Sequence, residues 1–90
     1  MSAELVIRCG TVVDGTGNPG FRAAVGVRDG RLVVLRGATD GIGAARRIDA
    51  RGRVVCPGFV DPHSHSGLVL LDEPDLSGKV LQGVTTEIIG

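Results

Sequence analysis

The alternation of apolar and polar side chains predicts short strands in the first half of the chain. Residues 4–13 alternate with a period of two, which places Leu5, Ile7 and Cys9 on one face of a half-buried strand. Gly10 interrupts the pattern, so we expect a bulge or tight bend there. Cys9 is then interpreted as a small buried apolar side chain.

Two apolar runs, residues 23–28 and 31–35, flank the pair Asp29-Gly30. This arrangement predicts a β-hairpin with a type I′ turn, because that turn requires positive φ at both central residues. The chain is therefore expected to reverse its direction at Asp29 and Gly30.

Glycine-rich segments separate the predicted strands. Residues 14–20 and 37–45 are interpreted as loops, and a further turn is predicted at Arg51-Gly52. Residues 14–20 lack the glycine spacing and the following helix of a nucleotide-binding loop, so we do not interpret them as a phosphate site. The first half is predicted to form a small antiparallel sheet.

The second half begins with a strand over residues 54–64, apolar on both faces near its start, as is typical of strands covered on both sides. Pro57 removes a ladder donor and marks an irregular end of this strand. Residues 72–82 predict a short helix with Gly83 at its C-terminal cap, and residues 84–89 predict another strand. Strand–helix–strand units are almost always right-handed and parallel.

Candidate chemistry lies near the end of the strand over residues 54–64. Asp61, His63 and His65 are spaced two apart, so on an extended strand they project to one side. Two imidazoles on one face can bind one metal ion, and barrel enzymes place their chemistry at the ends of buried strands. Pro62 blocks ladder pairing just before the first histidine. Because isolated His-x-His pairs also occur by chance on surface strands, the spacing alone favours a chance pair. The aspartate on the same face and the proline before the first histidine favour the metal site.

Composition narrows the class of protein. Ninety residues, 42% of them apolar, fit at most one small globular domain rather than a disordered chain. Ten basic and ten acidic residues balance, which argues against partners such as nucleic acid or an anionic membrane. Cys9 and Cys56 do not make a disulfide framework, and the opening residues lack the pattern of a signal peptide. A cytoplasmic location with reduced thiols is expected.

Residues 55–65, Val-Cys-Pro-Gly-Phe-Val-Asp-Pro-His-Ser-His, resemble the first barrel strand of the amidohydrolase superfamily, whose members read Pro-Gly-(Phe/Leu)-(Ile/Val)-Asp-x-His-x-His there. Nearly the whole chain resembles one branch, the N-acyl-D-amino-acid deacylases or D-aminoacylases. The segments that carry this wider resemblance are residues 10–17, 25–31, 48–59 and 82–86.

The resemblance implies a β-rich fold in which residues 1–53 form the antiparallel β-sandwich part and residues 54–90 begin a (β/α)8 barrel with its first βαβ unit. Such a barrel takes about 250 residues, so the chain is expected to be an N-terminal fragment. The implied full-length enzyme is a metal-dependent hydrolase that converts an N-acyl-D-amino acid into a D-amino acid and a carboxylate.

The resemblance also implies zinc as the cofactor, with one or two ions in the full-length enzyme and His63 and His65 as metal ligands. A catalytic zinc usually keeps three protein ligands, so the site is incomplete here. The family's further ligands include a cysteine in a Gly-Asn-Cys-Gly context beyond the second barrel strand. They also include histidines and a catalytic aspartate from later strands. No catalytic residue is therefore assigned within this chain.

Other polar residues receive supporting or structural roles. Asp61 lies deeper than the histidines and is expected to hydrogen-bond beside the ligands rather than bind metal. Cys56 has the opposite parity to the histidines, which favours a structural role, and Lys79 is interpreted as a solvated helix side chain. Glu87 is left open between the barrel interior and a rim or outward position. Gly67 stands where many relatives carry an aspartate, so the resemblance leaves the surroundings of the metal and the substrate range open.

Two alternatives stand beside the deacylase. One is a cyclic-amide hydrolase of the same superfamily, similar to hydantoinase or dihydroorotase. The other is an inactive β-rich module, since the ninety residues alone are expected to be inactive. The expected partner is a small-molecule N-acyl amino acid, without nucleic acid or membrane, and exposed barrel strands favour self-association.

Overall fold

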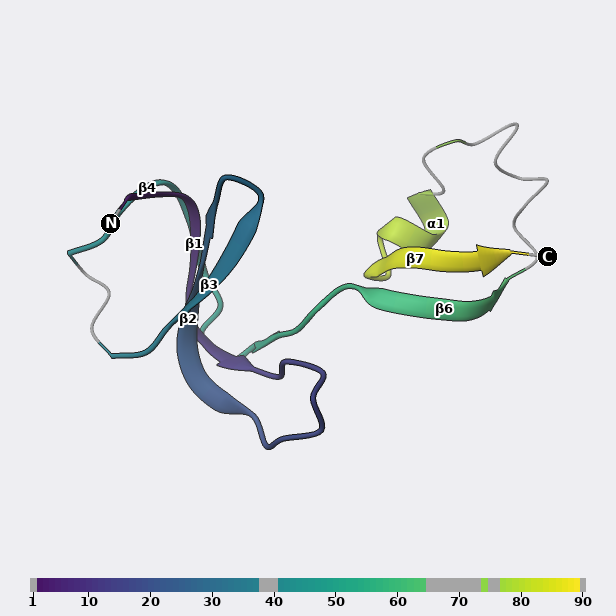
Figure 1. The fold of residues 1–90 in the computed structure, drawn as a ribbon, viewed down its shortest axis with the longest axis horizontal. Helices are drawn as coiled ribbons and strands as arrows, with labels where there is room; N and C mark the ends of the chain where they lie inside the picture. Colours follow the sequence, from purple (N-terminus) through teal and green to yellow (C-terminus); the bar gives the residue numbers. More distant parts are fainter. Residues whose placement is uncertain (1, 38–40, 65–73, 75–76, 90) are drawn as a thin grey trace. The chain divides into compact units, whose positions relative to one another are not determined.

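A computed structural model describes residues 2–37, 41–64, 74 and 77–89. The chain divides into two compact units, Met1–Pro57 and Gly58–Gly90. Figure 1 shows the elements of both units. The described part of the chain contains no helix with the length and apolar character needed to cross a bilayer.

The first unit is one mixed sheet. Its strands are β1 (Ser2–Val12), β2 (Phe21–Arg28), β3 (Arg31–Leu35), β4 (Gly43–Asp49) and β5 (Val54–Val55). The order is β3-β2-β1-β4, and Figure 1 labels these four strands. β5 also pairs with β1. The pairs β1–β2 and β2–β3 are antiparallel, whereas β1–β4 and β1–β5 are parallel.

The prediction of a purely antiparallel sheet is therefore wrong. After β3 the chain does not turn back beside it but rejoins the sheet on the far side of β1, running parallel to β1. A period of two identifies a strand but not the direction of its neighbour, and only antiparallel neighbours allow a tight turn. The expected loop over residues 37–45 also ends earlier, because β4 begins at Gly43. The described strands of this unit form a single sheet, and the two-layer sandwich stays a prediction.

The central strand β1 contains the expected bulge. Its register against β2 shifts between Ile7 and Gly10, and Cys9 adopts a φ of 64°. Gly10 leaves room for Ala50 and for Val55 of β5. A Cβ at position 10 would lie 2.7 Å from Val55 Cγ2 and 3.1 Å from Ala50 Cβ. The absence of a side chain at Gly10 thus lets Val55 of β5 pack closely against β1.

Burial along β1 differs from the prediction. The fully buried side chain is Val6, which packs in a cluster with Ala3 and Ala24, whereas the predicted inward residues Leu5 and Ile7 are half-buried. The burial pattern of β1 does not alternate strictly, so a period of two does not identify its most buried side chain.

The hairpin prediction is confirmed. β2 and β3 pair up to Arg28 opposite Arg31, and the two residues between them, Asp29 and Gly30, have φ values of 53° and 72°. Positive φ at both central positions is the geometry that the type I′ turn requires. The Asp29 N–H also donates a hydrogen bond to Glu4 Oε1 at 3.1 Å, which ties the turn to β1.

The second unit contains β6 (Phe59–Ser64), α1 (Ser77–Val80) and β7 (Val84–Ile89). β6 and β7 pair in parallel, and the Phe59 N–H donates to the Gly83 carbonyl at 2.8 Å where the pairing begins. The strand predicted over residues 84–89 is confirmed. The described part of the predicted helix is the single turn α1. Beyond the end of this helix, Gly83 has a φ of 89° and its N–H donates a hydrogen bond to the Val80 carbonyl at 2.9 Å.

The prediction of one strand over residues 54–64 is wrong. Val54 and Val55 pair with β1 in the first unit, and a new strand starts at Phe59 in the second. The break falls at Pro57, which has no N–H for a ladder. Two further irregularities lie inside β6, where the register against β7 shifts between Phe59 and Val60 and again between Asp61 and Ser64, across Pro62.

Candidate functional site

The candidate site lies on the C-terminal part of β6. Asp61 is half-buried, His63 is exposed and Ser64 is buried. The second predicted ligand, His65, lies outside the described residues, so the predicted pairing of the two imidazoles stays a prediction.

Both oxygens of the Asp61 carboxylate accept hydrogen bonds. Lys79 Nζ donates to Oδ2 at 2.6 Å, and the backbone N–H of His63 donates to Oδ1 at 3.2 Å. The hydrogen bond from Lys79, followed by that from His63, holds the pKa of Asp61 below its ordinary value of 3.8. Asp61 is therefore an ionised acceptor at neutral pH, and its expected role beside the metal ligands stays a prediction.

Lys79 joins three elements of the second unit. From α1 its ammonium contacts Asp61 on β6 and lies 3.5 Å from Glu87 Oε1 on β7. The hydrogen bond with Asp61, aided by the charges of both carboxylates, raises the pKa of Lys79 above 10.5. The prediction of a solvated Lys79 is wrong, because the helix return places this side chain over the paired strands.

Glu87 is not on an exposed rim of the described unit. Its side chain is 11% exposed and its carboxylate faces Lys79. Asp61 and Glu87 are direct partners in the β6–β7 ladder, so two carboxylates lie on neighbouring strands with one ammonium between them. The repulsion between these two carboxylates is offset by the ammonium that contacts both.

The described residues alone do not complete a metal centre. Among them no three His, Cys, Asp or Glu side chains cluster closely enough to hold a metal ion. His63 offers an exposed imidazole, a ligand that zinc accepts, whereas the Asp61 carboxylate is engaged by Lys79. His63 on β6 can therefore serve as one ligand of a metal ion, and its role as a ligand stays a prediction.

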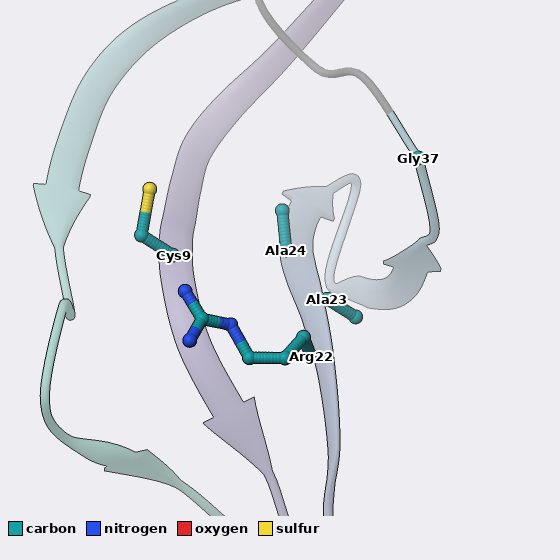
Figure 2. Close-up of a pocket in the computed structure, with 5 residues that line it drawn as sticks. All are labelled: Cys9, Arg22, Ala23, Ala24 and Gly37. Atoms are coloured by element: carbon teal, nitrogen blue, oxygen red, sulfur yellow. The ribbon is translucent and has the colours of Figure 1, made fainter.

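The two cysteines belong to the first unit, whereas β6 belongs to the second. Cys56 is exposed in the segment between β5 and β6, so the strand parity assumed for it does not apply. Cys9 is half-buried rather than buried and lines a cavity of about 290 Å³ in the first unit. The Arg22 side chain extends from β2 toward β1 in this cavity (Figure 2). The lining contains none of the predicted site residues: Cys9, Arg22, Ala23, Ala24 and Gly37.

Comparison with known proteins identifies the class. The family model described as "Amidohydrolase family" matches residues 46–90, and the chain belongs to this family. Within it, the chain is 44% identical to an N-acyl-D-glutamate deacylase of Alcaligenes xylosoxydans xylosoxydans and 41% identical to a D-aminoacylase of the same organism. Each alignment covers 97% of this chain and 18% of the relative. The resemblance to the D-aminoacylase branch is thereby confirmed.

A solved structure supports the same relationship. It is the crystal structure of N-acyl-D-glutamate deacylase from Bordetella bronchiseptica in complex with zinc and a phosphonate inhibitor. The match has a TM-score of 0.89 at 41% identity and covers 100% of this chain and 19% of the deacylase. The chain thus spans about a fifth of the length of the relatives that it matches.

Proposed function

We propose that this chain is the N-terminal part of a zinc-dependent amidohydrolase that hydrolyses N-acyl-D-amino acids to a D-amino acid and a carboxylate. The observation that carries the proposal is the 44% and 41% identity, over 97% of the chain, to an N-acyl-D-glutamate deacylase and a D-aminoacylase. An enzyme of this kind acts on a small molecule, and the proposal includes a cytoplasmic location.

The same proposal assigns β6, α1 and β7 to the first βαβ unit of a (β/α)8 barrel, and residues 1–53 to the sandwich part. Parallel pairing of β6 and β7, with α1 between them in the sequence, supports the barrel assignment. So do the large apolar side chains of the two strands, which are 47–59% exposed and are suited to being covered by further elements: Phe59, Val60, Ile88 and Ile89. In the isolated chain, the same surface favours self-association.

His63 and His65 are proposed as two of the zinc ligands, with one or two ions in the full-length enzyme. When bound, zinc polarises a carbonyl and lowers the pKa of a bound water to about 7. The residues of this chain would hold the ion at the end of β6, where Asp61 accepts the His63 N–H and restrains the backbone at the ligand. The exposed position of His63 supports this role.

Activity and metal content of the full-length protein test the proposal together. We expect hydrolysis of N-acetyl-D-glutamate or another N-acetyl-D-amino acid, little hydrolysis of the L-enantiomer, and loss of activity when a chelator removes zinc. His63→Ala and His65→Ala are expected to lower both zinc content and activity, whereas Leu32→Ala, at a side chain 72% exposed on β3, leaves both unchanged. Turnover of hydantoin or dihydroorotate instead would favour the cyclic-amide alternative.

The isolated ninety-residue chain is the matching negative control. Because its described residues supply a single exposed imidazole and no metal-binding cluster, we expect no hydrolysis from it. Hydrolysis by the full-length protein that persists after zinc removal would contradict the metal assignment.

A further inference from the structure

Lys79 is placed where it controls the carboxylate that contacts His63. Asp61 divides its two oxygens between Lys79 Nζ at 2.6 Å and the His63 N–H at 3.2 Å. The carboxylate is planar, so fixing Oδ2 on the ammonium also fixes the direction in which Oδ1 faces. A direct chain of contacts therefore runs from α1 through Asp61 to the backbone of His63.

The charges around Asp61 make this series of contacts depend on Lys79. Asp61 and Glu87 are ladder partners, and their side chains are 22% and 11% exposed. Like charges opposite one another on neighbouring strands repel, more strongly where water is partly excluded. Without the ammonium, Asp61 is driven away from Glu87 toward solvent, and Oδ1 leaves the His63 N–H.

We propose that Lys79 is a positioning residue for His63, acting through Asp61 to fix the backbone that presents this imidazole to the metal. The inference rests on the proposed function, because it concerns His63 as a zinc ligand. Lys79 itself contacts neither the imidazole nor the ion in this assignment. It acts by holding a carboxylate in one orientation.

Variants of the full-length protein test the inference with two readouts, zinc affinity and hydrogen exchange of the His63 amide in the metal-free protein. Lys79→Met keeps the length of the side chain and removes its charge. We expect the His63 amide to lose protection and the zinc Kd to rise about 10–100-fold, the usual effect of losing a residue that supports a metal ligand. Lys79→Arg restores a cation and is expected to recover most of the protection of the His63 amide and most of the zinc affinity.

The matched control is Gln82→Ala. Gln82 Nε2 donates to the Gly78 carbonyl at 2.7 Å beside α1, so its loss weakens the helical turn without touching Asp61. We expect the hydrogen-exchange rate of the His63 amide and the zinc Kd to remain as in the unmodified protein. An equal effect of Gln82→Ala and Lys79→Met would show that only helix stability matters and would overturn the inference.

A double-variant cycle tests whether Lys79 acts through Asp61. Asp61→Ala alone is expected to weaken zinc binding. Adding Lys79→Met to Asp61→Ala should produce little further loss of zinc affinity. A full additional loss, or zinc binding by Lys79→Met as tight as in the unmodified protein, overturns the inference while the proposed function stands. Absence of zinc from the unmodified protein overturns both. The cycle also serves where Lys79→Met alone fails to fold, because Asp61→Ala removes the carboxylate repulsion.

Discussion

The backbone of Gly58 lies directly against the side chain of Thr85 on β7. A Cβ at position 58 would overlap the Thr85 side chain, coming within 2.8 Å even of its Cβ. The contact lies at the start of β6, where Phe59 first pairs with β7. A residue without a side chain is therefore needed for the two strands to approach each other there.

Gly58→Ala is expected to destabilise the second unit by about 1–3 kcal/mol, the usual cost of overpacking. Hydrogen exchange of the β7 amides measures this locally. Gly43→Ala is the matched control, because among the described atoms a Cβ there would meet Ser2 Cβ alone, at an ordinary 3.8 Å. Unchanged protection of β7 in Gly58→Ala would contradict the contact.

Gly30→Ala is expected to destabilise the first unit by about 1–2 kcal/mol, because an L-residue is strained at its φ of 72°. Urea unfolding followed by circular dichroism measures the change. At Gly41 the φ lies outside the left-handed region and an added Cβ would meet none of the described atoms within 4 Å, so Gly41→Ala should be nearly neutral. Equal stability of the two variants would exclude a strained turn at Gly30.

Val6→Ala is expected to lower the free energy of unfolding of the first unit by roughly 2 kcal/mol, since Val6 is fully buried at the centre of β1. The same urea titration measures it. Leu32→Ala, at a residue 72% exposed, should change stability by less than about 0.5 kcal/mol. A larger loss from Leu32→Ala than from Val6→Ala would contradict this account of the core.

The loop after β1 carries a pH-dependent contact. Asp14 Oδ1 accepts hydrogen bonds from Thr16 Oγ1 at 2.6 Å and the Thr16 N–H at 3.0 Å, and these bonds, the hydroxyl first, hold the pKa of Asp14 below 3.8. A lowered pKa stabilises the folded loop above pH 3.8, and this stability is lost as the pH falls through the folded value. Carboxyl NMR titration should show the Asp14 pKa rising toward 3.8 in Thr16→Ala. Thr16→Ser, which keeps the hydroxyl, is expected to retain the low value.

Local features of the fold could be predicted from the sequence, whereas the pairing of distant segments could not. Asp29-Gly30 specifies its own turn through the φ values that these two residues tolerate, so the hairpin was predictable. Val54 and Val55 appeared continuous with the strand that follows, but their ladder partner is β1, far earlier in the chain. Apolar character does not encode which strand will be the neighbour.

The candidate site shows the same division. Asp61 could be given a hydrogen-bonding role because its position beside His63 is local. The role of Lys79 depends on how α1 returns over β6 and β7, and on Glu87 being the ladder partner of Asp61. Neither relationship is visible in a helical or strand period, so a solvated lysine was the natural but mistaken interpretation.

The pairing of β5 with β1 bears on how this protein is divided for separate expression of its halves. The Val13 N–H donates to the Val55 carbonyl at 2.9 Å, and the ladder joins Thr11 to Val54. A division after residue 53 would remove β5 from the first unit and leave the Val13 N–H without the Val55 carbonyl as its acceptor. A cut after Pro57 keeps the sheet intact and still releases β6 with its histidine.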